Sequence, residues 1–449
     1  MTAPDPKELK DPQFTRETAV AARAAGKQLA ALQASQRSAL LLDLAAALQQ
    51  PDARQKVLAA NHEDLASAAQ EEAAGRLAGP LVRRLVLDDK KIAGLVDGLR
   101  QLAAMEDTDA VGRILVRREL DTALVLERVV CPLGLLGVVF ESRPDALVQI
   151  ASLALRSGNA VLLKGGREAA ATNRALTALI QEVLASRGLP RQTASLLEAR
   201  ADVETLLGLD GVVDLVIARG SSAFISHVRR STQIPVMGHD AGICHLYLHA
   251  SASPSMAAAL AVDGKCSYPA ACNATETLLW EPGAAAALDA AVAALRAAGV
   301  ELHADEATRR RHPDLLAATP ADWDTEWGAL SLSIRCVGGL DEALLHIERH
   351  GTGHTEAIVA EDANAAAAFL AAVDAACVFH NASTRFSDGY RFGLGAEVGI
   401  STDKLHARGP VGVEGLYTYR WLLRGQGQVS TDYEPGRSGG RTFRHRNLL

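Results

Sequence analysis

The sequence predicts an α/β fold with two successive parallel-sheet domains and a small β hairpin. Short apolar runs alternate with helical stretches after residue 134, an order typical of parallel sheets with right-handed crossovers. The alternation starts again after a glycine-containing break at 238–242. Two strand-like runs, 114–119 and 124–130, are separated by four residues only, which predicts an antiparallel hairpin.

The first hundred residues predict helices. Ala, Leu, Gln and Arg dominate residues 16–50, where apolar side chains recur at helical spacing. Further helices are expected at about 55–74 and 90–105. An alanine-rich run at 284–298 has periodic Leu and Val side chains, which favour a packed helix over disorder.

Strand–helix units fill the rest of the chain. In the first series, strands are expected at 134–140, 160–163 and 212–217. Each is followed by an expected helix, at 145–156, 168–187 and 222–230 respectively. In the second series, strands are expected at 243–248, 276–280, 357–359 and 376–379. These series predict one domain over 1–242, with the hairpin at about 114–134, a second domain over 243–420, and a C-terminal tail over 421–449.

Charge and cysteine usage exclude several classes of protein. The chain has 449 residues and a formal net charge of −7, which argues against nucleic-acid binding by phosphate neutralisation. No apolar run approaches the roughly 18 residues of a membrane helix. Because the N-terminus lacks the pattern of a secretory signal and the six cysteines form no C-x-x-C pair, we expect a cytoplasmic protein without a metal site.

Polar residues follow several of the expected strands, where α/β sheets bind their ligands. Lys164 ends one strand and precedes Gly165 and Gly166, although a solvated lysine is an equal alternative. The segment 219–222 precedes a helix whose N-terminus would accept a phosphate, but a simple helix cap is favoured. Arg143 would bind a carboxylate or phosphate, or form a local ion pair.

Cys272 lies in a loop of small residues before a strand-like run. A thiol in such a loop would have a lowered pKa and act as a nucleophile, whereas for any one cysteine a packed small residue is the commoner role. His354 would be a base, although a lone loop histidine is usually a surface residue. The run 381–389 offers hydroxyl groups and Arg385 to an anionic tail, or forms an ordinary turn.

Five segments together match one family in residues and in order: Phe140–Leu147, Gly158–Gly166, Tyr268–Asn273, His354–Ile358 and Arg385–Glu397. They resemble gamma-glutamyl phosphate reductase, or glutamate-5-semialdehyde dehydrogenase, a family of the aldehyde dehydrogenase superfamily. The resemblance implies the superfamily fold and an NADPH-dependent reduction of L-glutamate 5-phosphate to L-glutamate 5-semialdehyde and phosphate. That reaction is a step of proline biosynthesis.

The resemblance also implies a role for individual residues. Cys272 matches the nucleophile, which would form a thioacyl intermediate that hydride then reduces. Substrate contacts are expected at Ser142, Arg143, Asn273, Ser383 and Arg385. NADPH or NADP is expected to bind Lys164, Gly165, Gly166, Arg167, Gly220, Ser221 and Glu326. Within that set Lys164 and Glu326 would hold the two riboses, Arg167 the 2′-phosphate and Ser221 the pyrophosphate.

Two departures from the superfamily bear on the chemistry. Oxidising members carry a glutamate base in a Glu-Leu-Gly-Gly segment, and the corresponding residues here, 236–242, contain no glutamate. This absence suits an enzyme whose thioester must avoid water. The Ser142–Arg143 region takes the place of the superfamily's oxyanion asparagine, so we expect Arg143 to contact the leaving phosphate or the acyl oxygen.

Other functions and the partners remain as hypotheses. Three alternative hypotheses are an oxidative aldehyde dehydrogenase that acts on another semialdehyde, a thiol hydrolase with a histidine beside Cys272, and a non-catalytic scaffold. The hairpin and the C-terminal tail resemble the superfamily's oligomerisation elements, which implies a homo-oligomer, a dimer or a dimer of dimers. We expect a small-molecule substrate, no nucleic acid, no membrane, and a transient contact with glutamate 5-kinase.

Overall fold

The protein is described by a computed structural model that covers residues 12–77, 79–105, 110–141, 143–239 and 241–449. The chain forms two compact units. The first unit comprises the described residues up to Ala218, together with Ser231–Val236 and Gly412–Leu449; the second comprises Arg219–Arg230 and Met237–Val411. Among the described residues, no helix has the length and apolar character needed to cross a membrane.

Helices begin the first unit, as the sequence predicts. They are α1 (Pro12–Ala30), α2 (Ala34–Gln49), α3 (Pro51–Ala73), α4 (Gly79–Leu85) and α5 (Asp89–Ala104). Local chemistry sets their starts: Pro51 opens α3, where its missing N–H costs nothing, and the Asp88 carboxylate accepts from the Lys91 N–H to cap α5.

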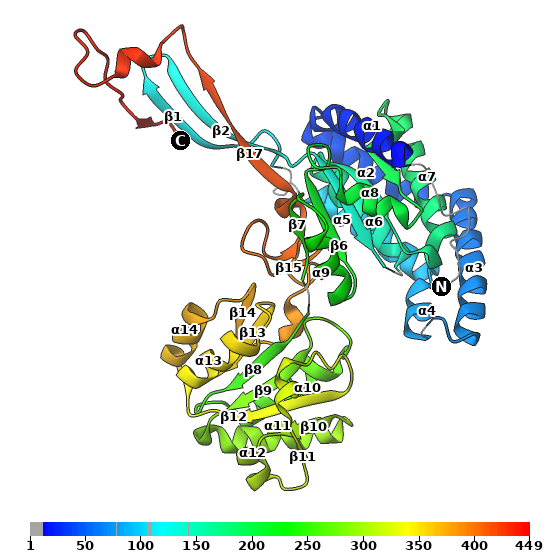
Figure 1. Ribbon diagram of the computed structural model, residues 1–449, viewed down its shortest axis with the longest axis vertical. Helices are drawn as coiled ribbons and strands as arrows, with labels where there is room; N and C mark the ends of the chain where they lie inside the picture. Colours follow the sequence, from blue (N-terminus) through cyan, green and yellow to red (C-terminus); the bar gives the residue numbers. More distant parts are fainter. Residues whose placement is uncertain (1–11, 78, 106–109, 142, 240) are drawn as a thin grey trace. The chain divides into compact units, whose positions relative to one another are not determined.

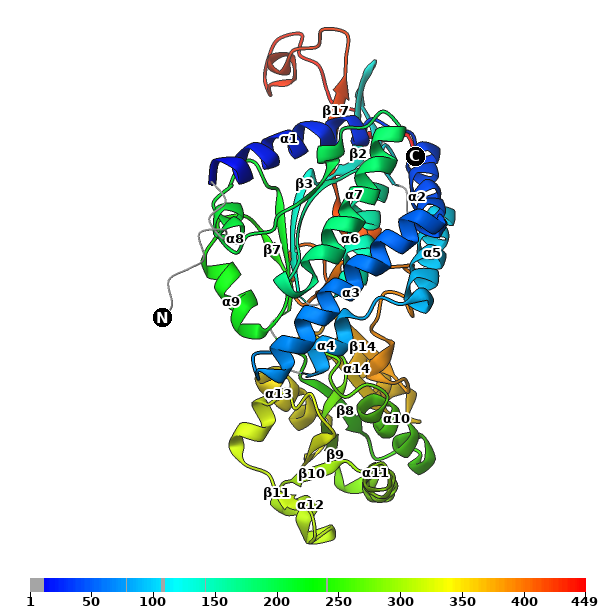
Figure 2. The ribbon, with the colours of Figure 1, turned by 90° about the vertical axis from the view of Figure 1, so that its right-hand side faces the viewer.

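A five-stranded sheet of order β5-β4-β3-β6-β7 forms the core of the first unit. Its strands are β3 (Leu135–Phe140), β4 (Ala160–Lys164), β5 (Ala194–Leu196), β6 (Leu215–Arg219) and β7 (Val236–Met237). The intervening helices are α6 (Pro144–Arg156), α7 (Ala170–Ser186) and α8 (Ala201–Leu207), of which α6 and α7 lie side by side (Figure 2). Strands β3 and β4 are buried throughout and pair in parallel, which explains their unbroken apolar sequences.

The predicted hairpin is confirmed and belongs to a four-stranded sheet of order β17-β2-β1-β18 (Figure 1). Strands β1 (Ile114–Asp121) and β2 (Leu124–Pro132) turn at Ala123, whose φ is +58°. Strands β17 (Tyr417–Arg424) and β18 (Arg446–Asn447) come from the C-terminal segment and pair antiparallel with β2 and β1. The Asp121 carboxylate joins that segment to the hairpin, because it accepts from the Tyr433 hydroxyl at 2.9 Å.

The second unit contains a seven-stranded parallel sheet of order β11-β10-β12-β9-β8-β13-β14. The strands are β8 (Cys244–Leu248), β9 (Thr275–Trp280), β10 (Glu301–Ala304), β11 (Leu316–Ala317), β12 (Ser331–Cys336), β13 (Thr355–Val359) and β14 (Cys377–His380). A short antiparallel pair, β15 (Gly399–Ser401) and β16 (Gly409–Val411), follows them, and α9 (Ser222–Arg230) and α12 (Glu306–Arg311) complete the unit.

Helices cover both faces of this sheet (Figure 1). Helices α10 (Pro254–Cys266) and α11 (Ala285–Ala297) pack against Leu246, Leu278 and the other apolar side chains of one face. Helices α13 (Leu340–His350) and α14 (Ala363–Ala372) pack on the opposite face around Tyr247 and Leu279. Strand β8 lies between β9 and β13, so β9 to β12 are added on one side of β8 and β13 and β14 on the other.

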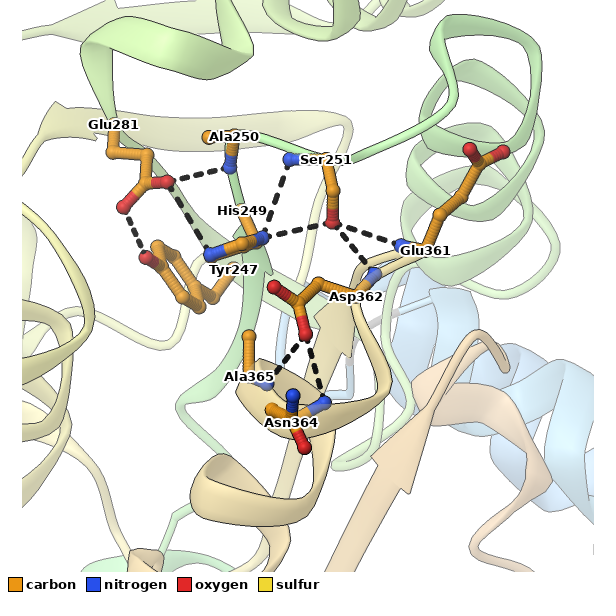
Figure 3. A network of polar contacts seen from close by, with 9 residues as sticks. All are labelled: Tyr247, His249, Ala250, Ser251, Glu281, Glu361, Asp362, Asn364 and Ala365. Atoms are coloured by element: carbon orange, nitrogen blue, oxygen red, sulfur yellow. Dashed lines mark hydrogen bonds and ion pairs between the residues drawn. The ribbon is translucent and has the colours of Figure 1, made fainter.

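A polar network joins the carboxyl ends of β8, β9 and β13 (Figure 3). The Glu281 carboxylate accepts from the Tyr247 hydroxyl at 2.6 Å and from the Ala250 N–H at 2.5 Å. The Ser251 hydroxyl accepts from the Glu361 and Asp362 N–H groups at 3.0 and 2.9 Å. This edge of the sheet is therefore locked by mutual hydrogen bonds, and the opposite, amino-terminal edge carries the cysteine that the sequence singles out.

Candidate active site

Three loops meet at the amino-terminal edge of the seven-stranded sheet. The loop before β8 carries His239, the loop before β9 carries Cys272, and the loop before β13 carries His354. One ligand atom from each of these side chains lies within 4.8 Å of the other two. The two imidazole rings meet edge to face, with their centroids 5.2 Å apart. Two histidine side chains therefore lie beside the Cys272 thiol, and the sequence alone does not identify them as its neighbours.

Gly242 allows the first of these loops to lie against the backbone of Cys272. A Cβ atom on Gly242 would lie 1.8 Å from the Cys272 carbonyl oxygen and 2.5 Å from its carbonyl carbon. On its other side, the Gly242 N–H donates to the Glu326 carboxylate. The same Cys272 carbonyl accepts from the Cys244 thiol, at a distance of 3.4 Å. Backbone contacts therefore fix the position of the nucleophile loop.

A buried ion pair closes the two ends of that loop, residues 267–274. Lys265, in the last turn of α10, lies 2.5 Å from Glu276 near the start of β9, and neither side chain is exposed. Burial raises the pKa of Glu276 to about 7, and burial lowers the pKa of Lys265. Because each group is the other's counter-charge, removing one of them leaves a buried charge without compensation.

The surroundings of Cys272 keep its thiol protonated. Its pKa is raised to about 12, first by burial and then by the carboxylates of Glu397 and Glu326, while the charges of Arg219 and Arg385 act to lower it. The lowered pKa expected from the sequence is therefore wrong, because the thiol itself is largely withdrawn from water, although Ser267, Tyr268 and Ala270 of the same loop are exposed. At neutral pH, formation of the thiolate requires a base or an arriving positive charge.

His354 is fully buried, so the interpretation as a surface histidine is wrong. Burial, followed by the proximity of His239, lowers its pKa to about 3 and keeps the ring neutral. Its Nδ1 lies 2.8 Å from the Thr355 hydroxyl, which lies 2.7 Å from the Ser387 hydroxyl. Ser387 donates onward to the Thr384 carbonyl at 2.9 Å.

The hydroxyl chain sets the tautomer of His354. Since a carbonyl only accepts, Ser387 donates to it and Thr355 donates to Ser387. Nδ1 of His354 then carries the proton and donates to Thr355, which leaves the lone pair on Nε2. Within the described part of the chain, that Nε2 atom is buried and has no hydrogen-bond partner. It is a proton acceptor on a ring that has a nitrogen within 4.8 Å of the Cys272 sulfur.

Of the other residues of this unit that the sequence assigned to the substrate, Asn273 and Arg385 flank Cys272. Ser383 does not, because it caps a short helix. Asn273 donates through Nδ2 to the Ser387 carbonyl at 2.9 Å, and its buried Oδ1 has no partner among the described residues. Arg385 donates through Nε to the Ser267 hydroxyl at 3.1 Å, which keeps its charge on the nucleophile loop. Ser383 instead caps the short helix at Thr384–Phe386, where its hydroxyl accepts from the Arg385 N–H at 3.3 Å.

The cofactor residues of the first unit lie at the carboxyl end of β4. Lys164 is only 8% exposed and its ammonium donates to the Gly165 carbonyl at 2.6 Å, so the solvated alternative is wrong. Burial lowers the pKa of Lys164. A Cβ on Gly165 would lie 2.2 Å from the Asn173 amide nitrogen, and one on Gly166 would lie 2.0 Å from Glu168. Arg167 follows directly and begins a short 3₁₀ helix.

The remaining predicted residues lie beside helix starts or outside the description. Arg143 is the residue before Pro144, which opens α6, and Ser142 lies outside the described residues. Gly220 and Ser221 are exposed between β6 and α9, where the Ser221 hydroxyl accepts from the Phe224 N–H at 3.4 Å. Glu326 belongs to the second unit and contacts Gly242 as described.

Comparisons with known proteins identify the fold and the relatives of this chain. No family model matched it. The gamma-glutamyl phosphate reductase of Synechococcus sp. (strain JA-3-3Ab) is 53% identical over 430 residues, which cover 95% of this chain and 93% of that protein. A gamma-glutamyl phosphate reductase of Natronomonas pharaonis is 51% identical over 382 residues, which cover 85% of this chain and 86% of that protein.

Solved structures agree with these relatives. The crystal structure of a gamma-glutamyl phosphate reductase from Thermotoga maritima matches with a TM-score of 0.88 and 36% identity, over 92% of this chain and 99% of that one. A glyceraldehyde-3-phosphate dehydrogenase from Methanocaldococcus jannaschii, complexed with NADP, matches with a TM-score of 0.67 at 13% identity, over 93% and 95% of the two chains. The second likeness concerns the fold alone, and the predicted aldehyde dehydrogenase-like fold is confirmed.

The first prediction concerns the reactivity of Cys272. Because its pKa is about 12, the thiolate fraction and the rate of alkylation by iodoacetamide should rise about tenfold per pH unit from pH 7 to pH 10. The rate is measured by fragment-ion mass spectrometry that localises the label to Cys272, with a peptide that lacks cysteine as the internal reference. A plateau below pH 9 would contradict this prediction.

The second prediction concerns the contact between Gly242 and Cys272. In Gly242→Ala the new Cβ overlaps backbone atoms, so we expect a loss of about 1–3 kcal/mol in the free energy of unfolding, measured by urea titration. The control is Gly94→Ala on α5, where a Cβ meets nothing within 4 Å and should stabilise the helix by about 0.5–1 kcal/mol. Unchanged stability of Gly242→Ala would show that the loop yields.

Proposed function

The chain belongs to the gamma-glutamyl phosphate reductase family of oxidoreductases, and from this premise we propose that it reduces L-glutamate 5-phosphate to L-glutamate 5-semialdehyde with NADPH. The family supports a place in proline biosynthesis, and we propose that the protein acts in the cytoplasm. The observation that carries the proposal is Cys272, whose sulfur lies within 4.8 Å of a ring nitrogen of the neutral His354, in a chain 53% identical to a gamma-glutamyl phosphate reductase.

The first chemical step forms a thioester on Cys272. Nε2 of His354 accepts the thiol proton, and Sγ attacks the acyl carbon of the substrate. The bond between that carbon and the phosphate oxygen breaks, and phosphate leaves with the bonding electrons. Negative charge on the acyl oxygen is stabilised by the Cys272 N–H and by the amide of Asn273, while Arg385 and Arg143 are assigned to the anionic groups of the substrate.

Reduction then releases the aldehyde. A nicotinamide dinucleotide, when bound, supplies a hydride to the thioester carbon. Cys272 leaves as the thiohemiacetal collapses, and its sulfur recovers the proton that His354 had accepted. The absence of a glutamate base in 236–242 leaves the thioester without the group that activates water in oxidising relatives, so reduction is favoured over hydrolysis.

The residues present suit such a dinucleotide. Lys164 is a buried ammonium at the carboxyl end of a parallel strand, the position where α/β sheets bind nucleotides. The absence of side chains at Gly165 and Gly166 keeps the backbone there accessible, and Arg167 adds a charge suited to a 2′-phosphate. Gly220 and Ser221 offer N–H groups ahead of α9 to a pyrophosphate, and Glu326 is assigned to the nicotinamide ribose.

The third prediction tests the reaction in reverse. With glutamate 5-semialdehyde, phosphate and NADP, we expect NADPH to form only when phosphate is present, measured by absorbance, because phosphate must displace the acyl group from sulfur. Cys272→Ser should lose this activity, whereas Cys266→Ser, at the end of α10, should retain it. NADPH formation without phosphate would support an oxidative aldehyde dehydrogenase instead.

A thiol hydrolase is the second candidate, because Cys272 and His354 also form the pair that such an enzyme requires. The forward assay, with L-glutamate 5-phosphate and NADPH, separates the two. Release of glutamate from L-glutamate 5-phosphate without any oxidation of NADPH would favour the hydrolase.

We propose that the four-stranded sheet mediates homo-oligomerisation. Strand β17 is at one edge of that sheet, and the described residues provide no strand on its outer side. Tyr419, Trp421 and Leu423 alternate along β17 and are 51%, 51% and 57% exposed. The Arg128 guanidinium on β2 lies over the Tyr419 ring, 4.8 Å from its centroid. An exposed edge with such a row is a surface that a second copy of the chain would cover.

The fourth prediction tests this surface. Trp421→Asp places a charge in the apolar row, and we expect the molar mass measured by light scattering to fall to that of a smaller assembly or of the single chain. Leu405→Asp is the matched control, since Leu405 is 92% exposed in the other unit and should leave the mass unchanged. An unaltered mass for Trp421→Asp would place the interface elsewhere.

A further inference from the structure

We propose that His239, Cys272 and His354 form a binding site for a thiophilic divalent cation, with Zn²⁺ the best match, and that the bound cation reversibly blocks the nucleophile. Within the residues that the structure describes, these three are the one group of His, Cys, Asp or Glu side chains whose ligand atoms cluster in this way. They come from three loops far apart in sequence. The expectation of a chain without a metal site rested on the absence of C-x-x-C pairs, and it does not take account of ligands that only the fold brings together.

In both histidines the hydrogen bond at Nδ1 leaves a lone pair on Nε2, the form of imidazole that binds a metal. His239 Nδ1 lies 3.2 Å from the Ile400 carbonyl, which only accepts, so Nδ1 carries the proton and Nε2 carries the lone pair. His354 has the same tautomer through its hydrogen bond to Thr355. A histidine whose Nδ1–H is held by an oxygen acceptor is the usual arrangement behind a metal-bound Nε2.

His354 supplies a second, independent indication of a ligand. It is 0% exposed, and its Nε2 is buried without a hydrogen-bond partner among the described residues. Leaving a buried polar atom unpaired costs roughly 1–3 kcal/mol, so such atoms call for an explanation at each site. A bound cation satisfies this nitrogen fully.

The donor set selects among cations. One thiolate and two imidazoles match the sulfur and nitrogen ligands of Zn²⁺, with bonds of about 2.3 and 2.0 Å and a fourth position left for water. Mg²⁺ and Ca²⁺ prefer oxygen ligands and match this set poorly. Glu326 and Glu397 act electrostatically on Cys272 and add negative charge that favours a cation. Ligand atoms now within 4.8 Å would close by about an ångström on binding.

Binding has a defined chemical balance. The S–H bond of Cys272 breaks, its proton passes to solvent, and the sulfur lone pair forms the bond to Zn²⁺. No electron is transferred, so a chelator that removes the cation restores the thiol. While Zn²⁺ is bound, the sulfur is not available to any electrophile, and Nε2 of His354 accepts no proton.

The fifth prediction is tested by binding, without reference to catalysis. The full chain, freed of metal with a chelator, is titrated with Zn²⁺ by calorimetry and with Co²⁺ by absorbance. We expect one ion per chain and a near-ultraviolet thiolate-to-cobalt charge-transfer band. Cys272→Ser should lose the band, and His354→Gln should weaken Zn²⁺ binding by more than about tenfold. The controls are Cys266→Ser and His312→Gln, which should bind as the parent does.

Alkylation provides a second readout that needs no variant of the site. Zn²⁺ should protect the Cys272 peptide from iodoacetamide, Mg²⁺ at the same concentration should not, and the chelator should restore the reaction. Absence of stoichiometric binding, or binding unchanged in both Cys272→Ser and His354→Gln, would overturn the proposal. These measurements stand even if the reductase assay fails, and the assay stands if Zn²⁺ does not bind.

Discussion

The site depends on one steric constraint, the approach of the Gly242 backbone to the Cys272 backbone. No side chain fits between them, since a Cβ on Gly242 would lie 1.8 Å from the Cys272 carbonyl oxygen. From that contact the Gly242 N–H extends to Glu326, and the ion pair of Lys265 with Glu276 closes the nucleophile loop at its ends. The backbone that carries Cys272 is therefore positioned by a close backbone contact and by buried charges.

This arrangement leaves buried polar atoms without hydrogen-bond partners, which lowers the free energy of unfolding. Nε2 of His354 and Oδ1 of Asn273 are both buried and lack a hydrogen bond among the described residues. Stability alone would favour apolar atoms at both places, because each unsatisfied group opposes folding. Both atoms flank Cys272, whereas the carboxyl edge of the same sheet, around Glu281, is densely hydrogen-bonded. This contrast supports the proposal that ligands bind at the amino-terminal edge, although Thr277 Oγ1 and His245 Nε2 in the same sheet are also without partners among the described residues.

The sequence predicts the buried strands well and the polar ones poorly. Strands β3 and β4 are short, continuous apolar runs, the sequence pattern typical of buried parallel strands. Strand β12 escapes prediction because Ser331, Ser333 and Arg335 interrupt its apolar side chains, and its place in the middle of the sheet depends on tertiary packing. Cys272 is predictable from its motif, but His239 is not, since a single loop histidine has no periodicity and no spacing relation to a partner distant in sequence.

The protonation states of the site explain which ligands it favours. The pKa of Cys272 is about 12 and that of His354 about 3, so the pair rests as a neutral thiol and a neutral imidazole. Separating the proton between them would create two buried charges, which burial penalises strongly. A ligand that brings its own positive charge removes that penalty by stabilising the thiolate. A zinc ion has this property, and so does the oxidised nicotinamide of the reverse reaction. In the forward reaction the reduced nicotinamide is neutral, so the thiol proton passes to Nε2 of His354 at that cost.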